Sequence, residues 1–131
     1  MEAVSRGAAE AGGRVLAVTA RVFGGPANRW VSEETVVDTW QDRLFKLIEL
    51  GDAYVALPGG TGTLAEIAVV WEMLNKRVIE RRPLILLGGF WKPMVDLVQA
   101  VENQGSPWVA ADQNLVQIAE SPKDAVGLLQ R

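Results

Sequence analysis

Five small residues between two apolar segments have the types and order that could bind a phosphate group. Residues 59–63, Gly-Gly-Thr-Gly-Thr, follow the apolar run 53–57 and precede a segment whose apolar residues recur at helical spacing. Glycine lets the backbone approach an anion closely, and the first N–H groups of a helix have no partner inside the helix. A strand, a glycine-rich loop and a helix in this order predict an anion site. The predicted phosphate-binding residues are Gly59, Gly60, Thr61, Gly62 and Thr63.

The same residues have a simpler explanation as the start of a helix. Thr63 and Glu66 match the Ser/Thr-x-x-Glu capping box, in which the two side chains satisfy free backbone N–H groups. A cap needs one threonine and no cluster of glycines, whereas this loop has three glycines and two threonines in five positions. The composition therefore favours anion binding, and a capping role for Glu66 would not exclude it.

The residues around the loop resemble a known family. Residues 58–66, Pro-Gly-Gly-Thr-Gly-Thr-Leu-Ala-Glu, are similar to the PGGxGTxxE signature of the Lonely Guy family, whose members are often labelled lysine decarboxylase-like. A second family feature is an arginine fifteen positions before the proline, and Arg43 stands there. The resemblance extends from residue 1 to about residue 101. It implies that a nucleoside 5′-monophosphate is hydrolysed to free base and ribose 5-phosphate, with Arg43 and Glu66 as the catalytic pair.

This chemistry suits the two side chains. Cleavage of a glycosidic bond places positive charge on the sugar, which the Glu66 carboxylate could stabilise. Arg43 would hold Glu66 or neutralise the departing groups. As a side chain at the margin of an apolar helix stripe, Arg43 has the alternative role of covering apolar surface.

The residues next to these positions differ from those common in the family. Relatives carry Met-His-Glu-Arg-Lys around the arginine, where residues 40–44 read Trp-Gln-Asp-Arg-Leu, and Thr61 replaces a common tyrosine. The base therefore stays open between a cytokinin nucleotide and an AMP-like nucleotide.

Composition argues against several other classes of protein. The 131 residues have a net charge of −3 and contain neither histidine nor cysteine, so we expect no metal site. The acidic charge argues against a nucleic-acid partner, and no run of about eighteen apolar residues could span a membrane. With no signal-peptide pattern, we expect a cytoplasmic protein. No lysine adjoins the phosphate loop in sequence, so pyridoxal-dependent decarboxylation has no support and no cofactor is expected.

Helices and strands alternate along the chain, which predicts an α/β fold. We expect one nucleotide-binding domain over residues 1–131, a Rossmann-like, doubly wound parallel sheet with helices on both faces. Ligands bind such sheets at the carboxyl ends of strands, where residues 58–63 fall. Residues 20–35 are predicted to be a loop. The predicted strands are 14–19, 53–57, 83–87 and 115–119, and the predicted helices are 2–11, 36–50, 63–78, 92–103 and one that begins at residues 121–122.

The resemblance also implies expectations about the N-terminal part of the fold and about the oligomeric state. The family fold has two further strands before the first predicted helix, so the fold is expected to be N-terminally shortened, as a truncated form or as a shorter variant. Relatives form dimers, and we predict a homodimer that uses apolar side chains of two helices: Trp40, Phe45, Trp71 and Met73.

Two alternatives to the hydrolase remain open. A non-catalytic nucleotide-binding or molybdenum-cofactor carrier protein of the same fold is favoured by the shortened N-terminus. A protein that processes single-stranded DNA is disfavoured by the acidic charge.

Overall fold

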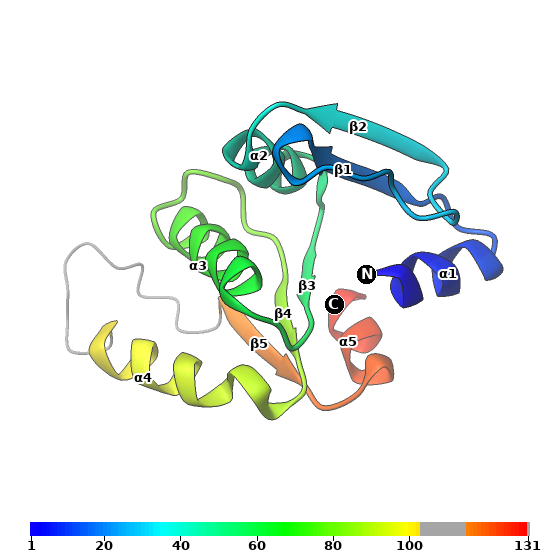
Figure 1. Cartoon of the computed structure of the whole chain (residues 1–131). Coiled ribbons are helices and arrows are strands. Elements are labelled where there is room, and N and C mark those ends of the chain that lie inside the picture. The colour runs from blue at the N-terminus through cyan, green and yellow to red at the C-terminus, as the bar shows by residue number, and fades with distance from the viewer. Residues whose placement is uncertain (103–114, 131) are drawn as a thin grey trace. The chain divides into compact units, whose positions relative to one another are not determined.

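The computed structural model describes residues 1–102 and 115–130, and the chain divides into two units, 1–50 and 51–131 (Figure 1). Each unit contains a parallel sheet with helices, so the predicted α/β, Rossmann-like class is confirmed. The prediction of a single domain over residues 1–131 stays a prediction. None of the helices in the described ranges is both long and apolar enough to cross a membrane.

In the first unit, a two-stranded parallel sheet packs against a helix. Strand β1 pairs with β2 from Leu16 opposite Glu33 to Ala20 opposite Val37. The apolar side chains between sheet and helix are buried, with Val18 on β1 and Leu44 and Ile48 on α2. The elements of this unit are α1 (Glu2–Glu10), β1 (Leu16–Ala20), the 3-10 helix η1 (Arg21–Phe23), β2 (Glu33–Val37) and α2 (Trp40–Leu50).

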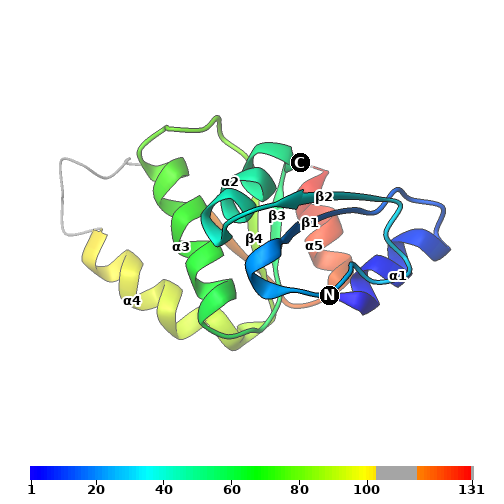
Figure 2. The same ribbon diagram turned by 45° about the horizontal axis from the view of Figure 1, so that its top comes forward.

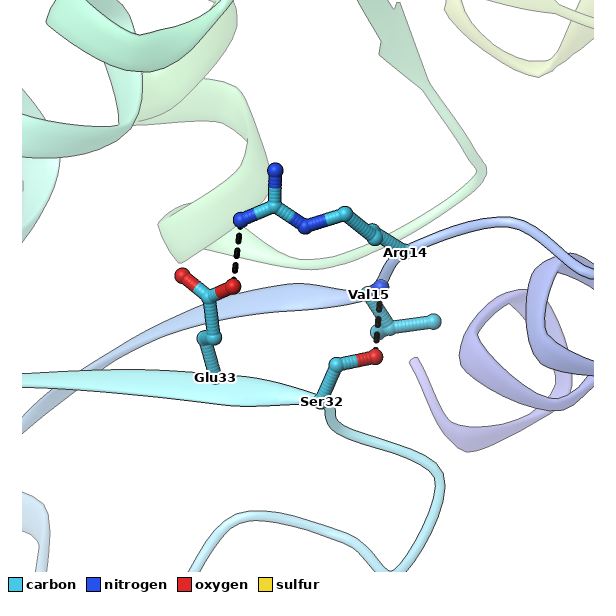
Figure 3. A network of polar contacts seen from close by, with 4 residues as sticks. All are labelled: Arg14, Val15, Ser32 and Glu33. Carbon is cyan, nitrogen blue, oxygen red and sulfur yellow. Dashed lines mark hydrogen bonds and ion pairs between the residues drawn. The ribbon is translucent and has the colours of Figure 1, made fainter.

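Strand β2 corrects two predictions, the loop over 20–35 and the helix over 36–50. Four of its five residues are exposed, so it lacks the alternating apolar pattern by which a strand is predicted from sequence. Polar contacts to distant residues fix its start: Arg14 reaches Glu33, and the Val15 N–H donates to Ser32 Oγ at 3.1 Å (Figure 3). The strand exists because β1 offers it a pairing edge, which no local pattern shows.

Helix α2 begins at Trp40 rather than at residue 36, because Thr39 caps it. Thr39 Oγ1 accepts a hydrogen bond from the Asp42 N–H at 3.0 Å, and its hydroxyl donates to the Asp42 carboxylate at 2.6 Å. This is the Thr-x-x-acid pattern of a helix start, which the sequence contains at 39–42. The cap places Val36 and Val37 in the preceding strand.

In the second unit, three parallel strands run in the order β3-β4-β5. The central strand β4 is the predicted apolar run and is buried on both faces, as parallel strands between helices are. Helices α3 and α4 lie on one side of this sheet and α5 on the other (Figures 1 and 2). The elements are β3 (Tyr54–Ala56), α3 (Thr61–Asn75), β4 (Leu84–Leu87), the 3-10 helix η2 (Gly89–Trp91), α4 (Lys92–Glu102), β5 (Val116–Ala119) and α5 (Pro122–Leu129).

A buried amide joins the last turns of α3 and α4. Asn75, the buried polar side chain of α3, donates from Nδ2 to Glu102 Oε1 at 3.1 Å. Burial, with a smaller contribution from the Glu72 charge, raises the pKa of the Glu102 carboxyl above its ordinary value. The predicted end of α4 at residue 103 lies outside the described residues.

Helix α3 ends with a residue in a left-handed conformation that usually requires glycine. Arg77 has φ of 55°, its N–H donates to the Leu74 carbonyl at 3.1 Å, and the Val78 N–H donates to the Met73 carbonyl at 2.8 Å. These two bonds form a Schellman motif, in which the left-handed position favours glycine because a Cβ is strained there. The helix therefore stops at Asn75, three residues before the predicted end at 78.

Arg77→Gly is expected to stabilise the protein by about 1 kcal/mol, because glycine removes the left-handed strain while both capping bonds remain. Urea unfolding measures the change. Arg77→Ala is the matched control: it removes the same charge but keeps the Cβ, so it is expected to gain nothing. Equal midpoints for the two variants would contradict the strain argument.

Candidate anion-binding site

The glycine loop lies where the sequence places it, between the carboxyl end of β3 and the first turn of α3. Residues 58–62 are exposed, so their backbone is accessible to a ligand. Strand β3 is shorter than the predicted 53–57 and ends at Ala56. The buried face of α3 anchors the helix that begins at this loop through Ile67, Val70, Trp71 and Leu74.

Helix α3 begins two residues earlier than predicted, and the predicted capping box is wrong. Its N-cap is Gly60 and its first residue is Thr61, with no side-chain hydrogen bond at the cap. Thr63 is therefore already inside the helix, where its hydroxyl cannot act as an N-cap for Glu66. With a glycine at the cap, no N-cap side chain covers the N–H groups of the first turn, which is the arrangement that suits an anion.

The glycines of the loop have different roles. A Cβ added to Gly59 would collide with the side chain of Thr63, approaching its Cβ to 2.9 Å, so the local fold requires glycine there. A Cβ on Gly60 or Gly62 would meet no atom within 4 Å. Packing does not explain these two glycines, whereas close approach of a ligand to the backbone would.

Glu66 lies in the second turn of α3, shortly after the loop. It is half-buried and stands four residues before Val70, which is buried on the same face of the helix. Glu66 thus lies at the margin of the buried face of α3. This position is compatible with a role beside a ligand that the loop holds.

Arg43 lies on α2 in the first unit, whereas Glu66 and the loop lie in the second. The Arg43 side chain is half-buried, and its Nε donates to the Val18 carbonyl oxygen on β1 at 3.1 Å. It does more than cover apolar surface, because this contact fixes its guanidinium against the sheet. Its pairing with Glu66 stays a prediction.

Trp91 was not singled out from the sequence, and one polar contact that it makes at the loop was missed. The Trp91 indole Nε1 donates to the carbonyl oxygen of Leu57 at 3.0 Å, immediately before Pro58. The order of the predicted strands could have indicated this contact. Residues after β4 lie beside residues after β3, because neighbouring parallel strands end at the same edge.

Comparison with known protein families supports the resemblance found in the motif. Residues 1–129 match a family model described as "Possible lysine decarboxylase". The match extends past the region of resemblance seen in the sequence, to the end of α5.

Three curated proteins are similar to this chain. A cytokinin riboside 5′-monophosphate phosphoribohydrolase of Rhodococcoides fascians is 29% identical over 112 residues, which are 80% of this chain and 55% of that protein. Two Oryza sativa subsp. japonica proteins are also similar. The probable cytokinin riboside 5′-monophosphate phosphoribohydrolase LOGL2 is 28% identical, and the cytokinin riboside 5′-monophosphate phosphoribohydrolase LOG is 30% identical. They match 76% and 68% of this chain, and 41% and 36% of their own lengths are covered. The chain thus spans about a third to just over half of these relatives.

Proposed function

Since the chain belongs to the Lonely Guy (LOG) family, whose model is described as "Possible lysine decarboxylase", we propose that it is a nucleoside 5′-monophosphate phosphoribohydrolase. The proposed reaction is hydrolysis of the glycosidic bond of a cytokinin nucleotide or AMP-like nucleotide to free base and ribose 5-phosphate. The names of the three relatives support this proposal: two are cytokinin riboside 5′-monophosphate phosphoribohydrolases, and the third is named as a probable one.

The observation that carries this proposal is the exposed loop with two glycines that packing does not require. We propose that the backbone N–H groups of Thr61, Gly62 and Thr63 bind the 5′-phosphate at the positive end of the α3 dipole. Gly59 and Gly60 shape the loop around it. Binding of the phosphate fixes the rest of the nucleotide relative to α3, so the binding energy of the phosphate orients the glycosidic bond for reaction.

In the proposed mechanism, Glu66 acts on the ribose. Glu66 lies at the margin of the buried face of α3, about one helical turn past the loop. As the base leaves, positive charge grows on the sugar, and a carboxylate near it lowers the barrier. Arg43, held by the Val18 carbonyl, is proposed to orient the Glu66 carboxylate.

The experiment that tests this function is incubation of the protein with AMP, with chromatography for adenine and ribose 5-phosphate. Adenosine is the control substrate, because it has the same glycosidic bond but no phosphate for the loop. Release of adenine from AMP and not from adenosine supports the proposal. Binding of AMP without release from AMP or any other common monophosphate would favour a non-catalytic nucleotide-binding or carrier protein.

We also propose that the protein forms a homodimer. The apolar side chains that support this have different exposures: Phe45 on α2 is 53% exposed, whereas Trp71 on α3 is 6% exposed. Trp71 therefore packs inside the chain and does not offer the surface that the sequence argument gave it. Sedimentation at micromolar concentration is expected to give the mass of two chains, and a monomer would refute the dimer.

A further inference from the structure

The indole of Trp91 contacts the loop at the point where the chain leaves β3. Trp91 is the last residue of η2, is 7% exposed, and donates from Nε1 to the Leu57 carbonyl oxygen at 3.0 Å. Leu57 is the residue between β3 and Pro58. A single side chain from another element thus contacts the backbone at the beginning of the glycine loop.

This carbonyl lies beyond the sheet. The register of β3 with β4 runs from Tyr54 opposite Leu84 to Ala56 opposite Leu86, and Leu57 follows it. Pro58 has no N–H group, so it cannot donate a bond that would close a turn here. A buried or half-buried carbonyl without a donor is costly, and Trp91 supplies the donor.

Trp91 is itself held in place by its neighbours. Its ring meets that of Phe90 edge to face, with ring centroids 4.8 Å apart and planes at 89°. Gly88, with φ of 76°, starts the turn into η2, and its N–H donates to the Ala119 carbonyl at 2.7 Å. The donor therefore projects from a segment fixed to the strands β4 and β5.

From this geometry we propose that Trp91 is a positioning residue for the phosphate-binding loop. Its N–H group fixes the Leu57 carbonyl and thereby the direction in which residues 58–60 leave the sheet. The N–H groups in the first turn of α3 are then aligned before a phosphate binds, so less conformational entropy is lost on binding. The role in catalysis rests on the proposed function, whereas the anchoring of the loop does not.

The test is Trp91→Phe, which keeps an aromatic ring and removes the donor. We expect the dissociation constant for AMP, measured by calorimetry, to rise about threefold to tenfold, the effect of one hydrogen bond. In an active protein, KM is expected to rise by that factor with kcat nearly unchanged. NMR relaxation of the free protein is expected to show lower amide order parameters at Gly59, Gly60 and Thr61. Trp91→Leu, an apolar side chain that also lacks a donor, serves if the phenylalanine variant does not fold.

Val95→Ala is the matched control, because it truncates a buried side chain of α4 and leaves both the indole donor and Leu57 in place. We expect it to lower the unfolding midpoint while it leaves the loop order parameters and the AMP dissociation constant unchanged. Loop order that is unaltered in Trp91→Phe, or lowered equally in Val95→Ala, would overturn the proposal. If the wild type releases no base, the proposed function fails, and the order parameters alone decide whether Trp91 anchors the loop.

Discussion

Glu66→Gln is expected to bind AMP with nearly wild-type affinity and to lose turnover by about two orders of magnitude or more, the effect of one charge-stabilising group. The substitution keeps the shape of the side chain and removes the negative charge that would stabilise the cationic sugar. Because α3 begins at Thr61 with a glycine cap, the variant removes no helix cap. Calorimetry gives the affinity, and the rate of adenine release gives the turnover.

Glu72→Gln is the control on the same helix. Its carboxylate is exposed and lies 3.9 Å from Lys76, an ion pair that contributes little at a surface. This variant is expected to keep full activity. If Glu66→Gln also keeps it, Glu66 has no part in the chemistry.

Arg43 tests whether the two residues act as a unit. Arg43→Ala is expected to lose turnover to a similar degree, and the double variant with Glu66→Gln is expected to be hardly worse than either single one, since paired groups are not additive. A double variant whose loss is the product of the two single losses would show that they act independently. Arg43 also donates to the Val18 carbonyl, so its removal could lower stability as well as turnover. The unfolding midpoints of Arg43→Ala and Arg43→Lys show whether a loss of turnover is accompanied by a loss of stability.

Gly60→Val is expected to weaken AMP binding about a hundredfold, the loss of two hydrogen bonds to a charged group. A Cβ at this position meets no protein atom, and φ of −95° is accessible to valine, so the fold is expected to survive. The added side chain would instead occupy the space through which a phosphate reaches the backbone. Calorimetry with AMP measures the effect.

Substitutions at two other glycines serve as controls for Gly60→Val. Gly127→Val on α5 also places a Cβ in open space, far along the chain from the loop, and is expected to leave AMP binding unchanged. Gly59→Ala, in contrast, is expected to disturb the loop itself through the collision with Thr63. Unchanged AMP affinity in Gly60→Val would refute the assignment of the loop as an anion site.

Local patterns in the sequence predicted a large part of this molecule. The apolar run that became β4 and the glycine loop before α3 are both contiguous in the chain. A buried parallel strand and an exposed turn are encoded by neighbouring residues, so they are visible without a structure. The family was also found from contiguous residues, 58–66, together with one spacing to Arg43.

Features that depend on distant partners were missed or misplaced. Strand β2 is exposed and polar, and it forms because β1 lies beside it. The start of α3 was misplaced by two residues for a local reason: the sequence offered Thr63 as a cap, whereas the helix begins at Thr61 with Gly60 as its cap. In both cases the backbone hydrogen bonds of the folded chain, and not the local residue pattern, set where the element lies.

The fold class, the glycine loop and the family could be predicted without a structure, because the patterns that indicate them lie mostly in adjacent residues. Which glycines packing requires, and which backbone carbonyl accepts the hydrogen bond of Trp91, could be seen only in the folded chain. Gly59 meets Thr63 while Gly60 and Gly62 face open space, and Trp91 reaches Leu57 across 34 positions of sequence. The physical reason is that a collision or a hydrogen bond depends on distances in space, which neighbouring parallel strands bring about between segments far apart in the chain.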